Sequence, residues 1–322
     1  MVRVASGGSP RLVGKPVSPS SRLSGIIMES QRGSSVRLDT VRGLVRRTVR
    51  MCLGPQGELA AHRLYHRFLR RIGRFSLPES RGNLAALALV SRQSNTILDI
   101  GANVGRYAWF FAQHARKGIS VYAFEPMPSA FALLEANMSR VPDVTCLPVA
   151  LGDGDGPVTL HVPLDSFGNM ITGLSWASSG EPRGNQVATE VALASLDYLV
   201  KTGRVIVRSP MFMKIDVEGF EYRVLSGARQ VLRDYRPVIY FECQSWALDR
   251  IHSQARSVWT LLGDAGYDVF AATDGVFDVH DNADREIVTY FAVPMSSKSP
   301  RQQRVTEEEF AILLTRVMAE AP

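Results

Sequence analysis

Hydrophobic and polar positions alternate between two periods from about residue 83 to residue 294. Short runs of β-branched and aromatic residues, typical of strands, are separated by segments whose apolar residues recur at helical spacing. We predict strands within 95–105, 120–126, 144–153, 211–219, 237–243, 267–273 and 286–294. We predict helices over 106–118, 129–141, 191–203, 221–234 and 255–266, and a polar, glycine-rich loop over 163–190. Strands that alternate with helices predict an α/β fold with a parallel, doubly wound sheet.

The residues before this body have a different pattern. Residues 1–35 are rich in Gly, Ser, Pro and Arg and contain few large apolar side chains, so we expect them to be disordered. Residues 36–52 and 58–74 carry apolar residues at helical spacing among many arginines, and the sequence GPQG separates them. We expect basic amphipathic helices, which either pack on the body with a solvated arginine face or bind a membrane surface.

The charge is divided at about the same place. Residues 1–75 contain 15 Lys and Arg against 3 Asp and Glu, a balance of +12, so the rest of this +6 chain carries −6. A basic segment of this kind can meet phosphates or an anionic membrane surface. We favour peripheral contact with an anionic membrane through residues 36–75 over nucleic-acid binding, because the arginines follow a helical spacing and form no base-reading motif.

Length and composition bound the remaining possibilities. A chain of 322 residues with 45% hydrophobic residues can form a complete core in one or two domains. No run reaches the roughly 18 apolar residues that span a bilayer, the N-terminus lacks the apolar stretch of a secretory signal, and the three cysteines lack metal-binding spacing. We therefore expect a cytoplasmic protein. Its expected organisation is a disordered tail over 1–35, basic helices over 36–82, an α/β domain over 83–295 and a C-terminal helical tail over 296–322.

The predicted strand in FMKIDVEG contains three charged residues, Lys214, Asp216 and Glu218. Successive strand side chains point to opposite faces, so these three are expected to share one face. A strand buried on both faces is normally a continuous apolar run. Charged residues in such a strand favour a functional site at its carboxyl end, where α/β sheets bind their ligands.

The segment LDIGANVG (98–105) places Asp99 at a strand end, followed by Gly101, Asn103 and Gly105 in the turn into a helix. Glycines permit positive φ and allow the backbone to approach a ligand closely. The spacing G-x-N-x-G differs from the dinucleotide fingerprint G-x-G-x-x-G, which disfavours a pyrophosphate ligand. We expect a smaller nucleoside with an adjacent charged tail.

Two further acids follow the second and third predicted strands. Glu125 ends the second strand, where an acid commonly accepts the hydroxyls of a ribose. A purely structural interpretation makes Asp99 a turn cap and Glu125 a solvated strand end, but two acids in consecutive βα units favour a binding site. Asp153 either faces the adenine end of the same ligand, with the backbone of 150–151 as another way to read the ring, or is an ordinary turn residue.

The motifs ILDIGANVG, VYAFEP, VALGD and MKIDVEGFE, in this order and spacing, resemble the FkbM family of S-adenosylmethionine-dependent methyltransferases. The resemblance covers roughly residues 96–293, and KIDVEG is its most specific part. It implies a Rossmann-like class I methyltransferase fold, with a seven-stranded, mostly parallel sheet, an antiparallel last strand and helices on both faces. It also implies small-molecule O-methylation, frequently of sugars, glycans or polyketides. The residues expected to hold S-adenosylmethionine are Asp99, Gly101, Asn103, Gly105, Glu125 and Asp153.

Asp216 and Glu218 are the candidates for the chemical step. In such a sheet they point toward the transferred methyl group from the strand beside the glycine turn. The acceptor alcohol must lose a proton, which makes Asp216 the first candidate base and Glu218 the second. Two alternatives stay open: Mg²⁺ bound by Asp216, Glu218 and Glu242, or a salt-bridged acid cluster that only fixes the loop. Lys214 is expected to pair with one of these carboxylates or with a neighbouring helix end.

Other segments bear on the acceptor. The loop 163–190 is long enough to be a lid or an acceptor-binding loop, and His252 follows Glu242 closely enough to enter an acceptor pocket. His62 and His66, four residues apart with no third ligand nearby in sequence, are expected at the surface.

The leading function is O-methylation of a hydroxyl on a sugar, glycan, glycolipid or secondary metabolite with S-adenosylmethionine as cofactor. The alternatives are a nucleic-acid methyltransferase that uses the basic arm, an NAD-dependent oxidoreductase on the same type of sheet, and a non-catalytic membrane-associated protein. The missing G-x-G-x-x-G argues against the oxidoreductase. The intact glycine turn together with Asp216 argues against a non-catalytic protein.

Overall fold

A computed structural model describes residues 48, 51–52, 54, 56–165, 176–177, 184–243, 257–273, 276–279, 289–295 and 304–322. The predicted disordered tail, most of the first basic helix, most of the loop 163–190 and His252 lie outside these residues.

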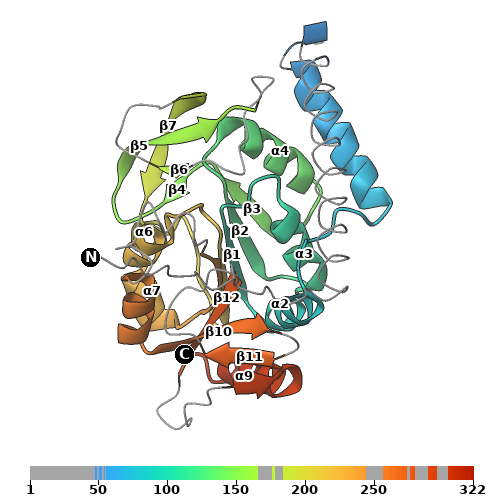
Figure 1. The fold of residues 1–322 in the computed structure, drawn as a ribbon. Coiled ribbons are helices and arrows are strands. Elements are labelled where there is room, and N and C mark those ends of the chain that lie inside the picture. Colours follow the sequence, from blue (N-terminus) through green and yellow to red (C-terminus); the bar gives the residue numbers. More distant parts are fainter. Residues whose placement is uncertain are drawn as a thin grey trace, which may run out of the picture.

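The main sheet has nine strands in the order β13-β11-β10-β12-β9-β8-β1-β2-β3 (Figure 1). Its parallel strands are β1 (Thr96–Ile100), β2 (Ser120–Phe124), β3 (Val144–Leu147), β8 (Met211–Ile215) and β9 (Val238–Glu242). The antiparallel part comprises β10 (Tyr267–Thr273), β11 (Val276–Val279), β12 (Thr289–Pro294) and β13 (Arg304–Thr306).

The predicted doubly wound sheet is confirmed, and its strand number is corrected. The expected seven strands are present as β10-β12-β9-β8-β1-β2-β3, and the last in sequence, β12, is antiparallel to both neighbours as expected. Strands β11 and β13 extend the β10 edge beyond this count. They contain only four and three residues, too few for the alternation of apolar and polar positions to indicate a strand.

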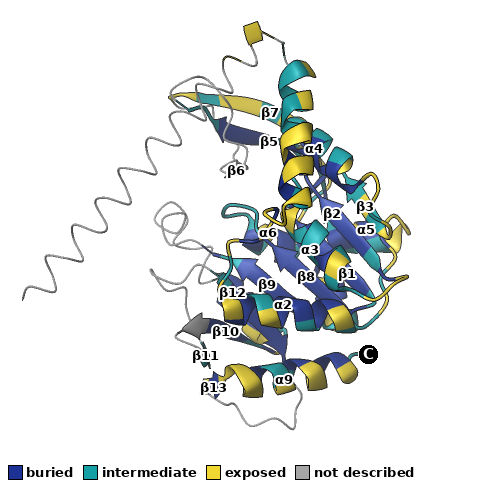
Figure 2. Ribbon diagram, turned by 90° about the vertical axis from the view of Figure 1, so that its right-hand side faces the viewer, coloured by how far each residue is buried: buried dark blue, intermediate teal, exposed yellow. Residues whose placement is uncertain are grey.

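Helices cover both faces of the sheet (Figure 2). Besides the N-terminal helix over 56–71, the described helices are α2 (Arg81–Gln93), α3 (Arg106–His114), α4 (Pro128–Met138), α5 (Leu196–Lys201), α6 (Glu221–Ser226), α7 (Arg229–Tyr235), residues 257–264 and α9 (Glu307–Ala319). One buried core, which includes Leu87, Phe111 and Phe310, joins α2, α3 and α9 to the sheet. A second core, which includes Leu196 and Leu232, joins α5 and α7 to the other face.

A second, four-stranded sheet was not predicted. Its order is β4-β7-β5-β6, with β4 (Ala150–Leu151), β5 (Gly156–Pro163), β6 (Trp176–Ala177) and β7 (Gln186–Ala194). The predicted strand 144–153 is therefore divided between two sheets, and the predicted helix 191–203 begins as strand β7. Strand β7 was not predicted because its exposed and buried positions do not alternate strictly, so the segment lacks the period of two that indicates a strand.

The predicted helix 221–234 is interrupted at Gly227. A Cβ at this position would lie 1.8 Å from the carbonyl oxygen of Gly152, so the backbone of 227 packs directly on the turn after β4. This close approach requires glycine, and it divides the segment into α6 and α7.

The N-terminal helix, described continuously over residues 56–71, packs beside α4 (Figure 1). Arg70 Nη1 donates a hydrogen bond to the carbonyl oxygen of Asn137 at 2.9 Å, and Asn137 Nδ2 donates to His66 Nδ1 at 3.1 Å. Burial, with smaller effects from His62 and nearby arginines, lowers the pKa of His66 to about 4, so the ring is neutral and accepts this bond. The prediction of a surface position for His66 was wrong, because the contact with α4 is invisible in the local sequence.

Across the described part of the chain, no helix combines the length and apolar character needed to cross a bilayer.

Candidate functional site

A cavity opens at the carboxyl ends of β1, β2 and β8. The order of the sheet reverses at this point, since β1 lies between β2 and β8, and such a crevice is where α/β sheets bind ligands. The empty space measures about 730 Å³, part of it open to solvent. The lining residues are Ile100, Gly101, Asn103, Phe124, Glu125, Pro126, Val149, Ala150, Leu151, Leu160, Asp216, Val217, Glu218 and Phe220.

The glycine turn forms one wall of the cavity. Gly101 has a φ of 76°, and a Cβ there would lie 1.8 Å from the carbonyl oxygen of Asp216. Glycine at this position is therefore required so that the turn after β1 can pack against the loop after β8. A larger residue would push these two segments apart, whether or not a ligand is bound. Gly105 does not line the cavity; its φ is 87° and its Cβ would lie 2.7 Å from Leu134, so it allows α3 to approach α4.

Glu125 follows β2 and lies beside this turn with only 7% of its surface exposed. Its Oε2 accepts a hydrogen bond from the Asn103 backbone amide at 2.8 Å, and its Oε1 accepts one from the Met127 amide at 2.9 Å. Burial raises the pKa of Glu125 to about 7, although both amide hydrogen bonds oppose the rise. Each carboxylate oxygen can accept a second bond, so Glu125 can bind two ligand hydroxyls at the cavity wall.

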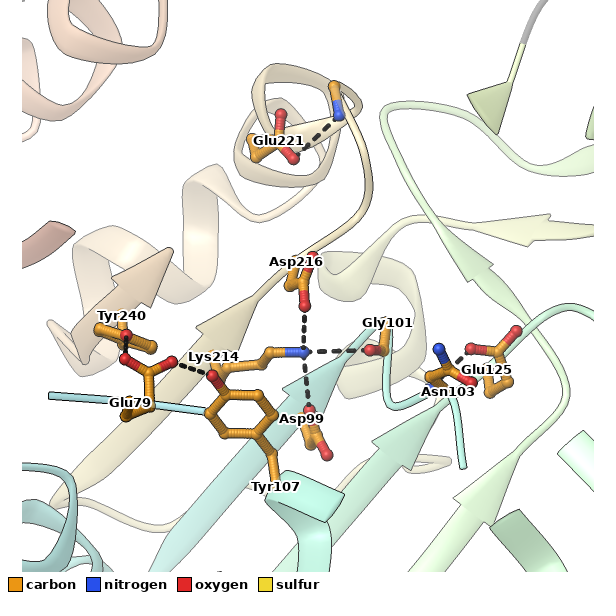
Figure 3. Close-up of polar contacts among 11 residues, drawn as sticks. Glu79, Asp99, Gly101, Asn103, Tyr107, Glu125, Lys214, Asp216, Glu221 and Tyr240 are labelled. Atoms are coloured by element: carbon orange, nitrogen blue, oxygen red, sulfur yellow. Dashed lines mark hydrogen bonds and ion pairs between the residues drawn. The ribbon is translucent and has the colours of Figure 1, made fainter. Parts of the chain in front are cut away.

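Lys214 lies at the centre of a buried charge cluster (Figure 3). Its Nζ lies 3.3 Å from Asp99 Oδ1 and 3.2 Å from Asp216 Oδ2, and it donates a hydrogen bond to the Gly101 carbonyl at 3.0 Å. Asp99 and Lys214 are register partners in the parallel pair β1–β8, which places their side chains on the same face. Burial lowers the pKa of Lys214, but the facing carboxylates of Asp216 and Asp99 outweigh this and raise it.

This cluster changes the interpretation of two predicted residues. Asp99 is 0% exposed and does not line the cavity. Its observed partner is Lys214. Strand β8 ends at Ile215, and Asp216 lies in the loop beyond it with 28% of its side chain exposed. Lys214, Asp216 and Glu218 therefore do not share one strand face as predicted. Of the partners expected for Lys214, namely Asp216, Glu218 or a helix end, the structure shows Asp216.

The loop after β8 and the start of α6 place two more acids near the cavity. Glu218 lines it and has a φ of 51°, a left-handed conformation that is unusual for a residue with a Cβ. Burial and then the neighbouring Asp216 carboxylate raise the pKa of Glu218 to about 8. Glu221 Oε1 accepts a hydrogen bond from the Gly219 amide at 3.1 Å in the first turn of α6, and burial raises its pKa to about 7.

The remaining predicted residues lie apart from the cavity. Asp153 Oδ1 pairs with Arg223 Nη1 at 3.3 Å on the surface. Within the described ranges no group of three His, Cys, Asp or Glu side chains could hold a metal ion, so Asp216, Glu218 and Glu242 do not form such a group there.

The sequence did not indicate several residues of the site. Val149, Leu160 and Phe220 line the cavity, and Glu79, Tyr107 and Tyr240 form a hydrogen-bonded group next to Lys214 (Figure 3). Phe220 directly follows VEG, and this position beside the motif was a local signal that could have indicated it as a site residue. Glu79 and Tyr107 had none, because their contacts join segments far apart in the chain.

The arrangement suits a nucleoside bearing a charged tail. Apolar side chains can enclose a flat base, Glu125 can accept hydroxyls, and the acids at 216 and 218 face the same space. An acceptor that binds beside such a ligand would meet a carboxylate capable of accepting a proton.

Comparison with known proteins gives a family match. A model of the methyltransferase FkbM domain matches residues 99–269. The hexuronic acid methyltransferase AglP of Haloferax volcanii is 29% identical over 156 residues, which is 46% of this chain and 56% of that protein. The 2-O-methyltransferase NoeI of Sinorhizobium fredii is 27% identical over 186 residues, which is 55% of this chain and 74% of that protein. The chain thus matches little more than half the length of the Haloferax protein.

Among solved structures, a methyltransferase FkbM from Methylobacillus flagellatus has a TM-score of 0.39 at 17% identity, covering 62% of this chain and 44% of that one. An O-methyltransferase from Bacillus cereus, solved in complex with SAH, has a TM-score of 0.42 at 13% identity, covering 78% of this chain and 97% of that one.

Proposed function

The chain belongs to the FkbM methyltransferase family, and from this premise we propose that it transfers a methyl group from S-adenosylmethionine to an alcohol oxygen. The acceptor that we propose is a hydroxyl of a sugar, glycan, glycolipid or secondary metabolite. Two of the similar proteins are named for a hexuronic acid and for 2-O-methylation, and a third, 43% identical over 49 residues, is the 31-O-demethyl-FK506 methyltransferase of Streptomyces tacrolimicus.

The observation that supports this proposal most strongly is the convergence of two kinds of residue on one cavity. Gly101, Asn103 and Glu125 line it together with Asp216 and Glu218. A site for methyl transfer needs a cofactor wall and an acceptor wall within reach of each other, because the acceptor oxygen must lie in line with the methyl group.

On the cofactor side, Glu125 would accept the two ribose hydroxyls, and Val149, Leu151 and Phe220 would enclose the adenine. When bound, S-adenosylmethionine supplies an electrophilic methyl group on a sulfonium. Asn103, whose amide fixes the Glu125 carboxylate, orients that hydrogen-bond acceptor before the cofactor arrives.

On the acceptor side, we propose Glu218 as the proton acceptor. Asp216 is the alternative, but its carboxylate is already engaged by Lys214 Nζ at 3.2 Å. A base works best when its pKa lies near the working pH, and the pKa of Glu218 is raised to about 8. In this assignment Asp216 has a fixed position at the cavity wall and stabilises the site without taking the proton.

The test is a turnover assay with a panel of sugar and macrolide alcohols. Loss of the base should reduce kcat by about 10²–10⁴ while the dissociation constant of S-adenosylmethionine stays nearly constant. Glu218→Gln should show this loss, and Asp216→Asn a smaller one. The reverse order would assign the base to Asp216. Activity that is abolished by a chelator and restored by Mg²⁺ would favour the metal-assisted alternative.

We also retain peripheral contact with an anionic membrane as a proposal for the N-terminal region. The helix 56–71 and the turn after it expose an apolar arc next to arginines, a combination typical of interfacial helices. These exposed side chains are Leu64, Tyr65, Phe68 and Ile72, with Arg63, Arg67 and Arg71 beside them.

Replacing Arg67 and Arg71 with Gln should weaken co-sedimentation with anionic vesicles, and the effect should diminish at high salt. Arg63 and Arg70 stay unchanged in this variant, because both donate hydrogen bonds to carbonyl oxygens of α4. Equal binding of the parent protein to neutral and anionic vesicles would contradict the membrane role.

A further inference from the structure

Glu79, in the segment just before α2, lies at the start of a series of contacts that ends at the cavity (Figure 3). Its Oε2 accepts hydrogen bonds from the Tyr240 hydroxyl at 2.6 Å and from Asn83 Nδ2 at 3.1 Å. Its Oε1 accepts a hydrogen bond from the Tyr107 hydroxyl in the first turn of α3. Burial raises the pKa of both tyrosines, so both hydroxyls keep their protons and donate.

The Tyr107 ring connects this group to the charge cluster. Lys214 Nζ lies 4.6 Å from the centre of the ring, within the range of a cation–π interaction. Such an interaction is stronger when the ammonium is shielded from water, and Lys214 is only 2% exposed. The same ammonium binds the Gly101 carbonyl and the Asp216 carboxylate, so it joins two walls of the cavity.

We propose that Glu79 is a positioning residue of the methyl-transfer site: it holds Tyr107 against Lys214, and Lys214 thereby holds Gly101 and Asp216 in their places at the cavity. Glu79 lies outside residues 99–269, so the match to the family model does not assign it a role. The proposal rests on the proposed function only in that the cavity binds S-adenosylmethionine.

The carboxylate is essential to this role because two hydroxyls donate to it at once. A glutamine in its place has a single oxygen, so at least one tyrosine hydroxyl must lose its acceptor or accept a bond from the amide instead. The side chain would remain nearly the same size, which makes Glu79→Gln a test of the hydrogen bonds rather than of packing.

The contacts can be observed through the lysine side chains. The chain contains few lysines, namely Lys15, Lys117, Lys201, Lys214 and Lys298. With ¹³C-labelled lysine, the ε-methylene signal of Lys214, identified by its loss in Lys214→Met, should be shifted upfield by the face of the Tyr107 ring. Glu79→Gln and Tyr107→Phe should both move it toward the other lysines. The control Glu308→Gln, on the exposed face of α9, should leave it in place.

The consequence for the site is measured by calorimetric titration of S-adenosylmethionine. Both single variants should bind S-adenosylmethionine more weakly, by at most about threefold to tenfold, because a residue that only positions the cavity can pass on no more than the free energy of the cation–π contact that is lost. If Glu79 acts through the Tyr107 hydroxyl, the double variant Glu79→Gln/Tyr107→Phe should bind no more weakly than either single variant. Additive losses, or a lowered melting temperature with an unmoved Lys214 signal, would overturn the proposal. Failure of the parent protein to bind would instead refute the proposed function, and the Lys214 signal would still test the contacts.

Discussion

Glu125 offers the most direct test of the cofactor site. Both of its oxygens face backbone amides, and each retains a lone pair that can accept a ribose hydroxyl. Hydrogen bonds to a charged group are worth about 1.5–3 kcal/mol, which corresponds to roughly ten- to hundredfold in affinity. We therefore expect Glu125→Ala to weaken S-adenosylmethionine binding by this factor.

The parent protein should also show a characteristic pH dependence. Burial raises the pKa of Glu125 to about 7, and in the proposed site the ribose hydroxyls would bind the anionic form. At pH 8 most molecules carry the anion, whereas at pH 6 only about a tenth do. Affinity should therefore fall about fivefold to tenfold from pH 8 to pH 6. Binding near pH 7 should release protons, because bound hydroxyls favour the charged carboxylate.

Calorimetry at pH 6, 7 and 8, in buffers of different ionisation enthalpy, measures both the affinity and the protons released. Glu135→Ala, an exposed glutamate on α4, serves as the control. Because Glu125 also orders the glycine turn, an S-adenosylhomocysteine analogue without ribose hydroxyls separates the two effects. The parent should lose as much affinity for that analogue as Glu125→Ala loses for S-adenosylhomocysteine. Equal binding by parent and variant, with no pH dependence, would refute the placement of the ribose.

Three further predictions concern stability. The pKa values of Glu125, Glu218 and Glu221 are raised, so the folded state holds extra protons and the melting temperature should rise as the pH falls from about 8 to 5. Glu218→Gln should flatten this rise, and a melting temperature that falls steadily over this range would contradict the prediction. In chemical denaturation, Gly101→Ala should lower the free energy of unfolding far more than Gly118→Ala, because both positions have positive φ but only at 101 would the Cβ meet backbone atoms. Equal losses of stability would mean that the backbone strain alone matters. Phe310→Ala should lower the free energy of unfolding by about 3–5 kcal/mol, since its buried ring stacks on the sheet. Ile312→Ala, on the exposed face of α9, should lower it little. Similar losses for the two variants would place α9 outside the core.

Local patterns were sufficient for the main architecture. TILDI, VYAF and MFMKI read as buried strands, and each is found at the predicted place in the parallel sheet. The turn after β1 was predictable because positive φ at Gly101 and Gly105 is a local property of glycine. These features depend on neighbours within a few residues, which is why they can be seen in the sequence.

The sequence also located most of the polar residues that line the cavity, since strand ends in a parallel sheet meet at one edge. Gly101, Asn103, Glu125, Asp216 and Glu218 all line it. The sequence could not show which acids would form an ion pair with Lys214. That depends on the register of β1 against β8, which places Asp99 opposite Lys214 and removes it from the cavity.

Contacts between distant segments were decided only by the tertiary structure. The need for glycine at 101 arises from the carbonyl of Asp216, more than a hundred residues away, and the break at Gly227 arises from Gly152. The short strands β11 and β13 exist because a sheet edge is available to pair with them. The contact of Glu79 with Tyr107 likewise requires α2 and α3 to pack on the same face of the sheet. A residue's type sets what it can bind, but its partner is set by packing, which no local pattern records.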